Sequence, residues 1–148
     1  MKLSFDQFVK LHQQDEPLLI ANVRNAQSAR LFEKLKFKAL ATSSAAVAST
    51  LGYSDGEQMS FDEYLFVVKR ISAVSSVPLS VDLEGGYGAI ADEVVSNIKA
   101  LVEEGVVGIN VEDSTMVSGT RKILDAGVFA DKLAQISAGL TLADARQP

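Results

Sequence analysis

The sequence predicts a parallel α/β fold, in which strands and helices alternate along the chain. Short apolar runs of strand length are separated by amphipathic stretches of helix length. These runs are continuously apolar, which is typical of parallel strands that are covered on both faces. After an extra N-terminal helix, the order is a strand followed by a helix, repeated about four times. An open doubly wound sheet and a (β/α) barrel share this order, so the pattern leaves both architectures open.

The first half of the chain supplies two strand–helix units. Residues 4–7 have the Ser-x-x-Gln spacing of a capping box, which predicts a helix that starts there and ends near His12. Apolar runs predict strands over residues 17–22 and 39–42. Between them, apolar residues at helical spacing predict a helix over 27–36. The second strand leads into a stretch of small residues that begins at Ser43.

The second half supplies the other two units. A second capping box at residues 60–63 predicts a helix that extends to about Ala73. Strands are predicted over 78–82 and 106–111, on either side of a helix over 91–104 that Gly105 closes. A last helix is predicted over 129–138, and residues 141–148 have no clear pattern.

Composition narrows the functional classes. The 148 residues predict one domain over 1–148, and the net charge of −5 without a basic cluster argues against binding to nucleic acid or to an anionic membrane. The absence of cysteine excludes disulfides, thiolate zinc sites and a cysteine nucleophile, and His12 is the single histidine. No apolar run approaches the roughly 20 residues of a membrane helix, and no signal region opens the chain. We expect a soluble, cytoplasmic protein whose chemistry depends on carboxylates and a hard metal ion.

Acidic residues follow the predicted third and fourth strands. The third strand runs into Asp82 and Glu84, and the fourth runs into Glu112 and Asp113. Ligands of parallel α/β folds bind at the carboxyl ends of the strands, so these acids, with Asp55, can converge on one rim. Crowded carboxylates repel one another unless a cation neutralises them. Oxygen ligands favour Mg²⁺ (or Mn²⁺), which can polarise an α-keto acid and stabilise an enolate.

Each of these features also has a purely structural interpretation. An acid after a strand often caps the next helix, and this interpretation is favoured for Asp113. The glycines among residues 85–88 either form a tight turn or let backbone N–H groups approach an anion. Ser43 and Ser44 are either helix caps or ligands, and Asp55 lies in a turn-like sequence. The segment 114–125, with Arg121 and Lys122, is either a plain connection or a lid that brings a cation over the site.

Five motifs resemble the isocitrate lyase and phosphoenolpyruvate mutase superfamily, most closely its small bacterial phosphonomutase-like members. They are Asn-Val with Ser-Ala-Arg (residues 22–30), Ala-Thr-Ser-Ser-Ala (41–45), Leu-Gly-Tyr-Ser-Asp-Gly (51–56), Asp-Leu-Glu-Gly-Gly-Tyr-Gly (82–88) and Gly-Ile-Asn-Val-Glu-Asp (108–113). The resemblance implies a (β/α)₈ TIM barrel, of which this chain holds about the first four βα units and the N-terminal helix. It also implies Mg²⁺-dependent cleavage or formation of C–C or P–C bonds in a small α-keto acid or phosphonate-type substrate.

The resemblance also implies roles for single residues. Asp82, Glu84 and Glu112 match the metal acids, and Asp82 also lies at the substrate. Ser43, Ser44 and Ala45 match the cradle of the substrate carboxylate. Asp55 matches an acid near the transferring group, and the stretch after Asp113, with Arg121 and Lys122 as catalytic candidates, matches the gating loop. That stretch lacks the cysteine of the isocitrate lyase signature, which argues against the thiol route, and Arg24-Asn25 stand where the family often has Trp-Asp.

Length is the larger departure, because a (β/α)₈ barrel needs roughly 200–250 residues. Half a barrel is expected to expose two strand edges and an inner face of Val and Leu side chains. The chain then pairs with itself as a homo-oligomer, pairs with a separate second half-barrel, or is a truncated or incomplete form. The leading hypothesis is a Mg²⁺-dependent lyase or phosphonomutase. The alternatives are an inactive remnant or half-barrel assembly partner without turnover, and an unrelated open α/β ligand-binding domain.

Overall fold

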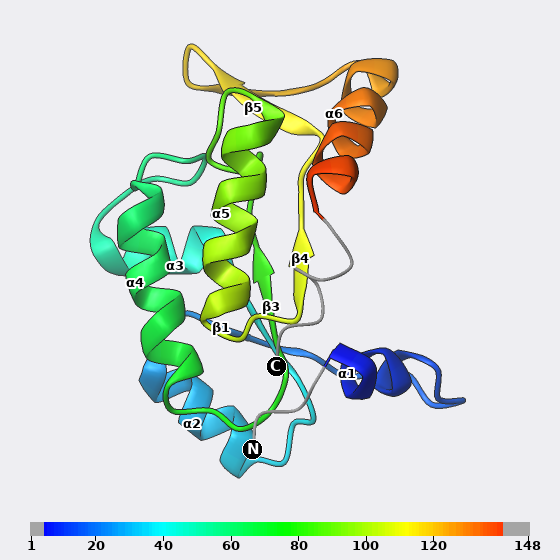
Figure 1. Ribbon diagram of the computed structural model, residues 1–148. Coiled ribbons are helices and arrows are strands. Elements are labelled where there is room, and N and C mark those ends of the chain that lie inside the picture. The colour runs from blue at the N-terminus through cyan, green and yellow to red at the C-terminus, as the bar shows by residue number, and fades with distance from the viewer. Residues whose placement is uncertain (1–4, 141–148) are drawn as a thin grey trace.

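The computed structural model describes residues 5–140, which form a four-stranded parallel sheet with helices around it (Figure 1). The strands are β1 (Ala21–Val23), β2 (Leu40–Thr42), β3 (Leu79–Asp82) and β4 (Gly108–Asn110). Their spatial order is β1-β2-β3-β4, and each neighbouring pair is parallel. A doubly wound sheet reverses its strand order at a switch point, whereas a barrel adds each strand on the same side. The uninterrupted order therefore favours the barrel of the two predicted architectures.

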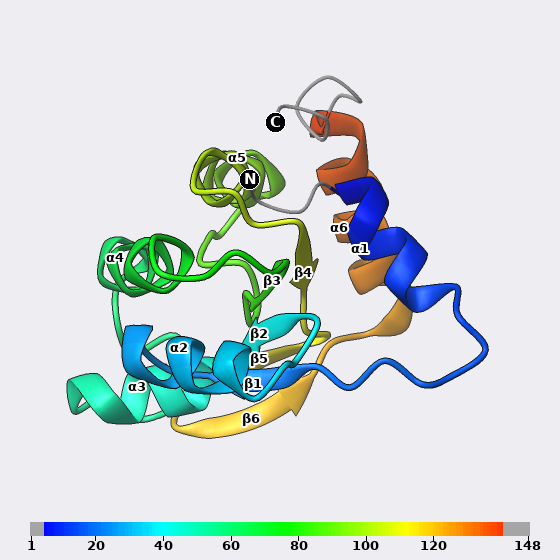
Figure 2. The ribbon, with the colours of Figure 1, turned by 90° about the horizontal axis from the view of Figure 1, so that it is seen from below.

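Helices cover one face of this sheet. Figure 2 shows α2 (Ala26–Lys34), α4 (Phe61–Ser72) and α5 (Ala91–Glu103) side by side along that face. The short helix α3 (Ser44–Leu51) follows β2 directly, and α6 (Ala126–Gly139) packs beside α5. None of the helices within residues 5–140 has the length and apolar character needed to cross a bilayer.

The helix α1 (Phe5–His12) lies against the opposite face of the sheet. Phe8 is buried, and a Cβ atom added at Gly108 would lie 2.9 Å from its ring and 3.1 Å from the Ser80 hydroxyl. Glycine at this position of β4 therefore leaves the space that the Phe8 ring fills.

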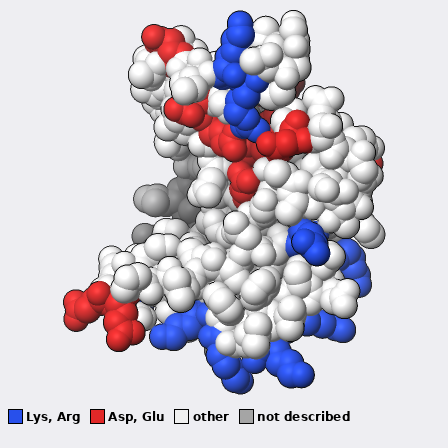
Figure 3. Space-filling view, turned by 180° about the vertical axis from the view of Figure 1, so that it is seen from behind, with Lys and Arg blue, Asp and Glu red and all other residues white. Residues whose placement is uncertain are grey.

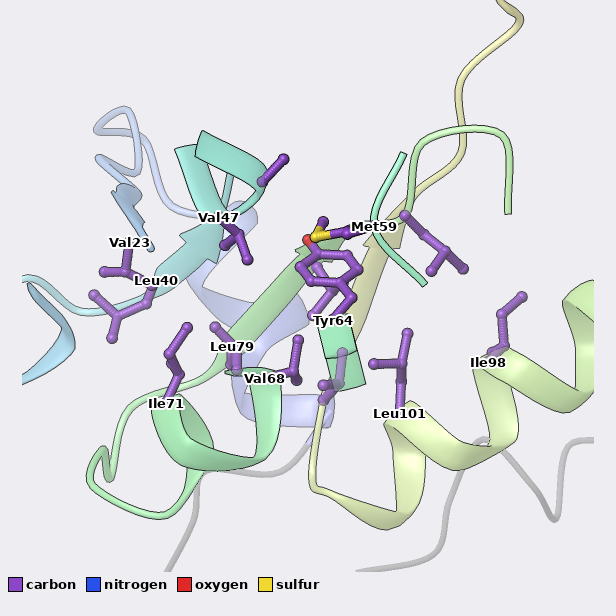
Figure 4. Close-up of a cluster of buried hydrophobic side chains, with 14 of the residues drawn as sticks. Val23, Leu40, Val47, Met59, Tyr64, Val68, Ile71, Leu79, Ile98 and Leu101 are labelled. Atoms are coloured by element: carbon purple, nitrogen blue, oxygen red, sulfur yellow. The ribbon is translucent and has the colours of Figure 1, made fainter. Parts of the chain in front are cut away.

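The core lies between the sheet and its helices (Figure 4). Leu79 and Val81 of β3 point into it and meet Tyr64, Val68 and Ile71 of α4, all of which are buried. Side chains of a strand alternate between the two faces, so the residues between them point to the inner side of the curved sheet. One register row on that side consists of Asn22, Ala41, Ser80 and Gly108.

The inner face is thus small and polar, and the expectation that it would expose Val and Leu is wrong. The apolar residues of the short strands Ala21–Val23 and Leu40–Thr42 are needed on the helix-covered side, where Ala21, Val23 and Leu40 are buried. Asn22 remains exposed.

Most predicted elements are present with shifted ends. The Ser60 hydroxyl accepts from the Glu63 N–H and the Glu63 carboxylate accepts from the Ser60 N–H, as the capping box predicts. The helix predicted to start at residue 129 begins at Ala126, because Asp125 caps it by accepting from two backbone N–H groups. The capping box that includes Ser4, and residues 141–148, lie outside the described residues.

Two elements were not predicted. The small residues after β2 form α3, with Ser43 as N-cap and Gly52 (φ 88°) as a left-handed C-cap. Residues 114–123 form an antiparallel hairpin of β5 (Ser114–Val117) and β6 (Thr120–Ile123), which pair only with each other within the described residues. Its two-residue turn has φ 51° at Ser118 and φ 76° at Gly119.

Candidate active site

A cavity of about 450 Å³ lies at the carboxyl ends of β3 and β4. The segments after these strands, the loop before α4, the β5–β6 hairpin and α6 form its walls. Its charged residues are Glu57, Glu84, Glu112, Arg121 and Lys132. Figure 3 shows acidic side chains gathered together on this side of the molecule, with basic side chains directly against them. Of the four acids predicted at this rim after β3 and β4, Glu84 and Glu112 line the cavity, whereas Asp82 and Asp113 do not.

Asp82 ends β3 and turns toward the start of α3. Its Oδ2 accepts hydrogen bonds from the Ser44 N–H (3.1 Å) and the Ser44 hydroxyl (2.7 Å). Ser43 caps α3 by accepting from the Ala46 N–H, so the cap interpretation of Ser43 is correct. Ala45 is exposed in the first turn of α3. The structure thus brings Ser43, Ser44 and Asp82 together, although Asp82 does not line the cavity.

A buried tyrosine fixes the backbone of Asp82. The Tyr64 hydroxyl donates to the Asp82 carbonyl (2.7 Å) and shares a 2.6 Å hydrogen bond with the Thr42 hydroxyl. The Asp82 N–H donates back to the Thr42 hydroxyl at 3.0 Å. Tyr64 is fully buried, and burial raises its pKa, so it stays protonated and keeps donating. This closed triangle holds β2, β3 and α4 in register at the candidate metal acid.

Glu84 is a buried carboxylate, only 2% exposed. Its Oε2 accepts from the Glu57 N–H (3.0 Å) and its Oε1 from the Tyr87 hydroxyl (3.1 Å). Burial raises the pKa of Glu84 to about 7, with a further contribution from the negative charge of Asp55. A cation bound nearby would favour the ionised form of this carboxylate.

Glu57 was missed by the sequence analysis. Its Oε1 accepts from the Tyr87 N–H at 2.9 Å, so Glu57, Glu84 and Tyr87 form an interlocked set. All three have left-handed backbones, with φ of 57°, 49° and 54°. Non-glycine residues in this region are strained by about 1–2 kcal/mol each and concentrate at functional sites.

Arg121 of the hairpin joins the remaining two acids. Its guanidinium pairs with Asp55 Oδ2 at 2.7 Å, and with Glu112 through its other terminal nitrogen. The Ser114 hydroxyl donates to Glu112 at 2.9 Å and accepts from Arg121 at 2.9 Å. The charges of Glu112 and Asp55 raise the pKa of Arg121. The Glu112 N–H donates to the Glu84 carbonyl at 2.6 Å, which holds the segments after β3 and β4 together.

Other predicted residues lie elsewhere. Lys122 is exposed and does not line the cavity. Asp113 does not cap α6; its carbonyl accepts from the Leu124 N–H at 2.7 Å and closes the base of the hairpin. Lys132 of α6, in contrast, reaches the cavity and donates to the Gly85 carbonyl at 2.6 Å. No pattern marked Lys132, because its place depends on how α6 packs.

The donor set suits a hard divalent cation held mainly through its waters. Within residues 5–140, no three His, Cys, Asp or Glu side chains converge tightly enough to enclose a metal ion directly. The nearby acids nonetheless offer only carboxylate oxygens, and both contacts to Asp82 within this range fall on Oδ2. Mg²⁺ keeps several waters and binds through few carboxylates, so acids that do not enclose an ion directly are still compatible with it.

Residues 8–145 match the family model of phosphoenolpyruvate phosphomutase. The chain belongs to this family. A solved putative phosphonomutase from Burkholderia cenocepacia superposes with a TM-score of 0.84 at 34% identity, over 92% of this chain and 55% of that one. The 2-methylisocitrate lyase of Escherichia coli is 33% identical over 100 residues, which are 67% of this chain and 34% of the relative. A phosphonopyruvate hydrolase solved with oxalate and Mg²⁺ shares the fold at 21% identity, with a TM-score of 0.83 over 96% of this chain and 50% of that chain.

These matches confirm the predicted superfamily and its TIM-barrel class. The chain spans about half the length of these solved structures and about a third of the Escherichia coli 2-methylisocitrate lyase. The four parallel strands and their helices are a partial (β/α)₈ barrel, and the relatives are lyases and phosphonomutases.

Proposed function

We propose that this chain carries the metal-binding part of the active site of a Mg²⁺-dependent lyase or phosphonomutase. The observation that carries the proposal is the meeting of acids from separate strands. Glu84 after β3 and Glu112 after β4 line one cavity, and Arg121 ties Glu112 to Asp55. Mn²⁺ is an equivalent ion for such ligands.

The substrate is a small α-keto acid or a phosphonate-type analogue. Relatives named 2-methylisocitrate lyase and phosphonopyruvate hydrolase support this class, and the hydrolase binds oxalate with Mg²⁺. A bound Mg²⁺ supplies polarisation of the keto oxygen and stabilisation of an enolate as a C–C or P–C bond changes. Asp82, Glu84 and Glu112 would hold this ion, largely through its waters.

The residues of this chain have distinct roles in the proposal. The first turn of α3, with Ser43, Ser44 and Ala45, would cradle the substrate carboxylate beside Asp82. Ser44 would then exchange its present hydrogen bonds to Asp82 for bonds to the substrate, at a helix N-terminus that favours an anion. Arg121 brings positive charge to the cavity wall, and Lys122 follows it on the same hairpin. Asp55 lies at the cavity edge through its ion pair with Arg121.

A second candidate is a half-barrel without turnover of its own, completed by a second copy or by a separate half. The open sheet favours it, because the outer sides of β1 and β4 have no strand partner within the described residues. The α6 side chains Val128 and Leu133 are also exposed, at 59% and 38%. We place this assembly, like the enzyme, in the cytoplasm.

Turnover assays separate the candidates. Purified chain is incubated with Mg²⁺ and oxaloacetate, phosphonopyruvate or a 2-methylmalate-type substrate, and the solution mass is measured with and without Mg²⁺. Asp82→Ala should abolish turnover, whereas Glu103→Ala, at the far end of α5, should not change it. Equal turnover by wild type and Asp82→Ala would remove the enzymatic proposal. No turnover by any variant, with a mass that corresponds to one chain or to a paired assembly, would support the second candidate.

A further inference from the structure

The hairpin already places a positive charge where the acids of the site meet. The guanidinium of Arg121 reaches from β6 across the cavity mouth and pairs with both Asp55 and Glu112. These acids come from separate segments, one before α4 and the other after β4. Arg121 is thus the group that offsets their mutual repulsion in this arrangement of the chain.

A divalent cation and Arg121 cannot both hold these carboxylates in the same way. Arg121 already occupies Oδ2 of Asp55 and Oε2 of Glu112. A divalent cation that bound either carboxylate would lie close to the guanidinium, and like charges at such separations repel. A bound Mg²⁺ with its waters carries twice the charge of the guanidinium. Ion pairs of this partly exposed kind are weak individually, so the equilibrium between the two cations is easily shifted.

The hairpin is built so that Arg121 can leave without disturbing the core. Strands β5 and β6 pair only with each other within the described residues, and Figure 1 shows them at the end of the molecule beyond the parallel sheet. The base is closed by the Leu124 N–H and the Asp113 carbonyl. The hairpin also has an apolar contact with the rim, since the Met116 side chain lies close to Gly56.

We propose that Arg121 is an internal competitor of the divalent cation, so that cation binding releases the hairpin from Asp55 and Glu112. The inference rests on the proposed function, because it needs a cation at Glu112, and it adds that this cation also displaces Arg121 from Asp55. It makes Arg121 an antagonist of the metal, in contrast to a residue that helps to hold it. Once released, the guanidinium can meet the anionic group of a substrate at the same cavity.

Binding of Mn²⁺ alone, measured by electron paramagnetic resonance or calorimetry, tests the competition without any activity assay. Arg121→Gln should bind Mn²⁺ roughly three- to tenfold more tightly than wild type, as expected for removal of two weak ion pairs. Lys122→Gln is the matched control, because it removes the same charge from the next residue, which points to the other face of the hairpin. In Lys122→Gln, the logarithm of the Mn²⁺ dissociation constant should change by less than half as much as in Arg121→Gln.

Trypsin reports on the hairpin itself. Mn²⁺ should accelerate cleavage after Arg121 and Lys122 severalfold in the wild-type chain, because the hairpin loses its charged contact. In Arg121→Gln, cleavage after Lys122 should already be fast and should not respond to Mn²⁺. Unchanged cleavage in the wild type at saturating Mn²⁺ would overturn the release step.

The outcomes separate this inference from the function on which it rests. If wild type and Arg121→Gln bind Mn²⁺ equally, or Arg121→Gln binds more weakly, the competition is refuted and the metal site stands. If neither protein binds Mn²⁺, both the competition and the proposed metal site fall.

Discussion

Removal of one buried hydroxyl should test how the fold supports the candidate site. Tyr64→Phe keeps the ring in the core but deletes the group that donates to the Asp82 carbonyl and shares a hydrogen bond with Thr42. Tyr64 is fully buried and Thr42 is 3% exposed, so water cannot easily replace the lost bonds. Leaving a buried polar group unpaired costs about 1–3 kcal/mol, and we expect the unfolding free energy to fall by about 2 kcal/mol.

Urea unfolding followed by circular dichroism measures this loss. With a denaturant slope of roughly 1–3 kcal/mol/M, the midpoint should fall by about 1 M. Tyr53→Phe is the matched control, because the Tyr53 hydroxyl is exposed and donates only to Glu63, at 2.9 Å, within the described residues. Its midpoint should stay within experimental error of wild type. If Tyr64→Phe were as stable as Tyr53→Phe, the triangle at Asp82 would not support the fold.

Three further predictions follow from other contacts. Because burial raises the pKa of Glu84 from 4.5 to about 7, the folded state holds more protons than the unfolded state between these values. The urea midpoint should therefore fall as pH rises through this window, and Glu84→Gln should flatten the slope; a rising midpoint in the wild type would contradict the assignment. Gly119→Ala should destabilise the chain by roughly 1 kcal/mol, because Gly119 has a positive φ. Gly56→Ala should destabilise it by more, because Gly56 also has a positive φ and its added Cβ would lie 2.5 Å from the Met116 side chain. Of these two variants, only Gly56→Ala should also speed tryptic cleavage of the hairpin. If both variants lost the same stability and were cleaved at the same rate, the Met116 contact would be excluded. Phe8→Ala should lower the unfolding free energy by roughly 3 kcal/mol in the same urea assay, and no change would show that α1 does not dock.

The sequence predicted the acidic rim because parallel strands bring their carboxyl ends to one edge, wherever the loops go. Glu84 and Glu112 follow adjacent strands and therefore had to be neighbours. Glu57 and Lys132 could not be found in this way, since the first depends on the path of a loop and the second on the packing of α6. Their positions depend on tertiary packing, and no local sequence pattern predicts them.

The missed elements have different causes. Most residues of α3 are small, so the segment lacks the apolar period that marks a helix. Ser43 and Asp82 stabilise its first turn from outside. The hairpin did carry a signal, because Ser118-Gly119 separates two four-residue runs in the manner of a two-residue turn with positive φ at both positions. The sequence analysis predicts a plain connection or a lid for this segment, and no strands in it.

The left-handed backbones of Glu57, Glu84 and Tyr87 have a consequence for engineering. Glycine at any of these positions would relax the local conformation, so a screen that selects only for thermal tolerance would tend to accept such replacements. Each replacement would delete a carboxylate or phenol that hydrogen-bonds to at least one of the other two residues. Replacements that raise thermal stability at these three positions should therefore lower the activity of the site. These positions can thus report a trade-off between stability and activity.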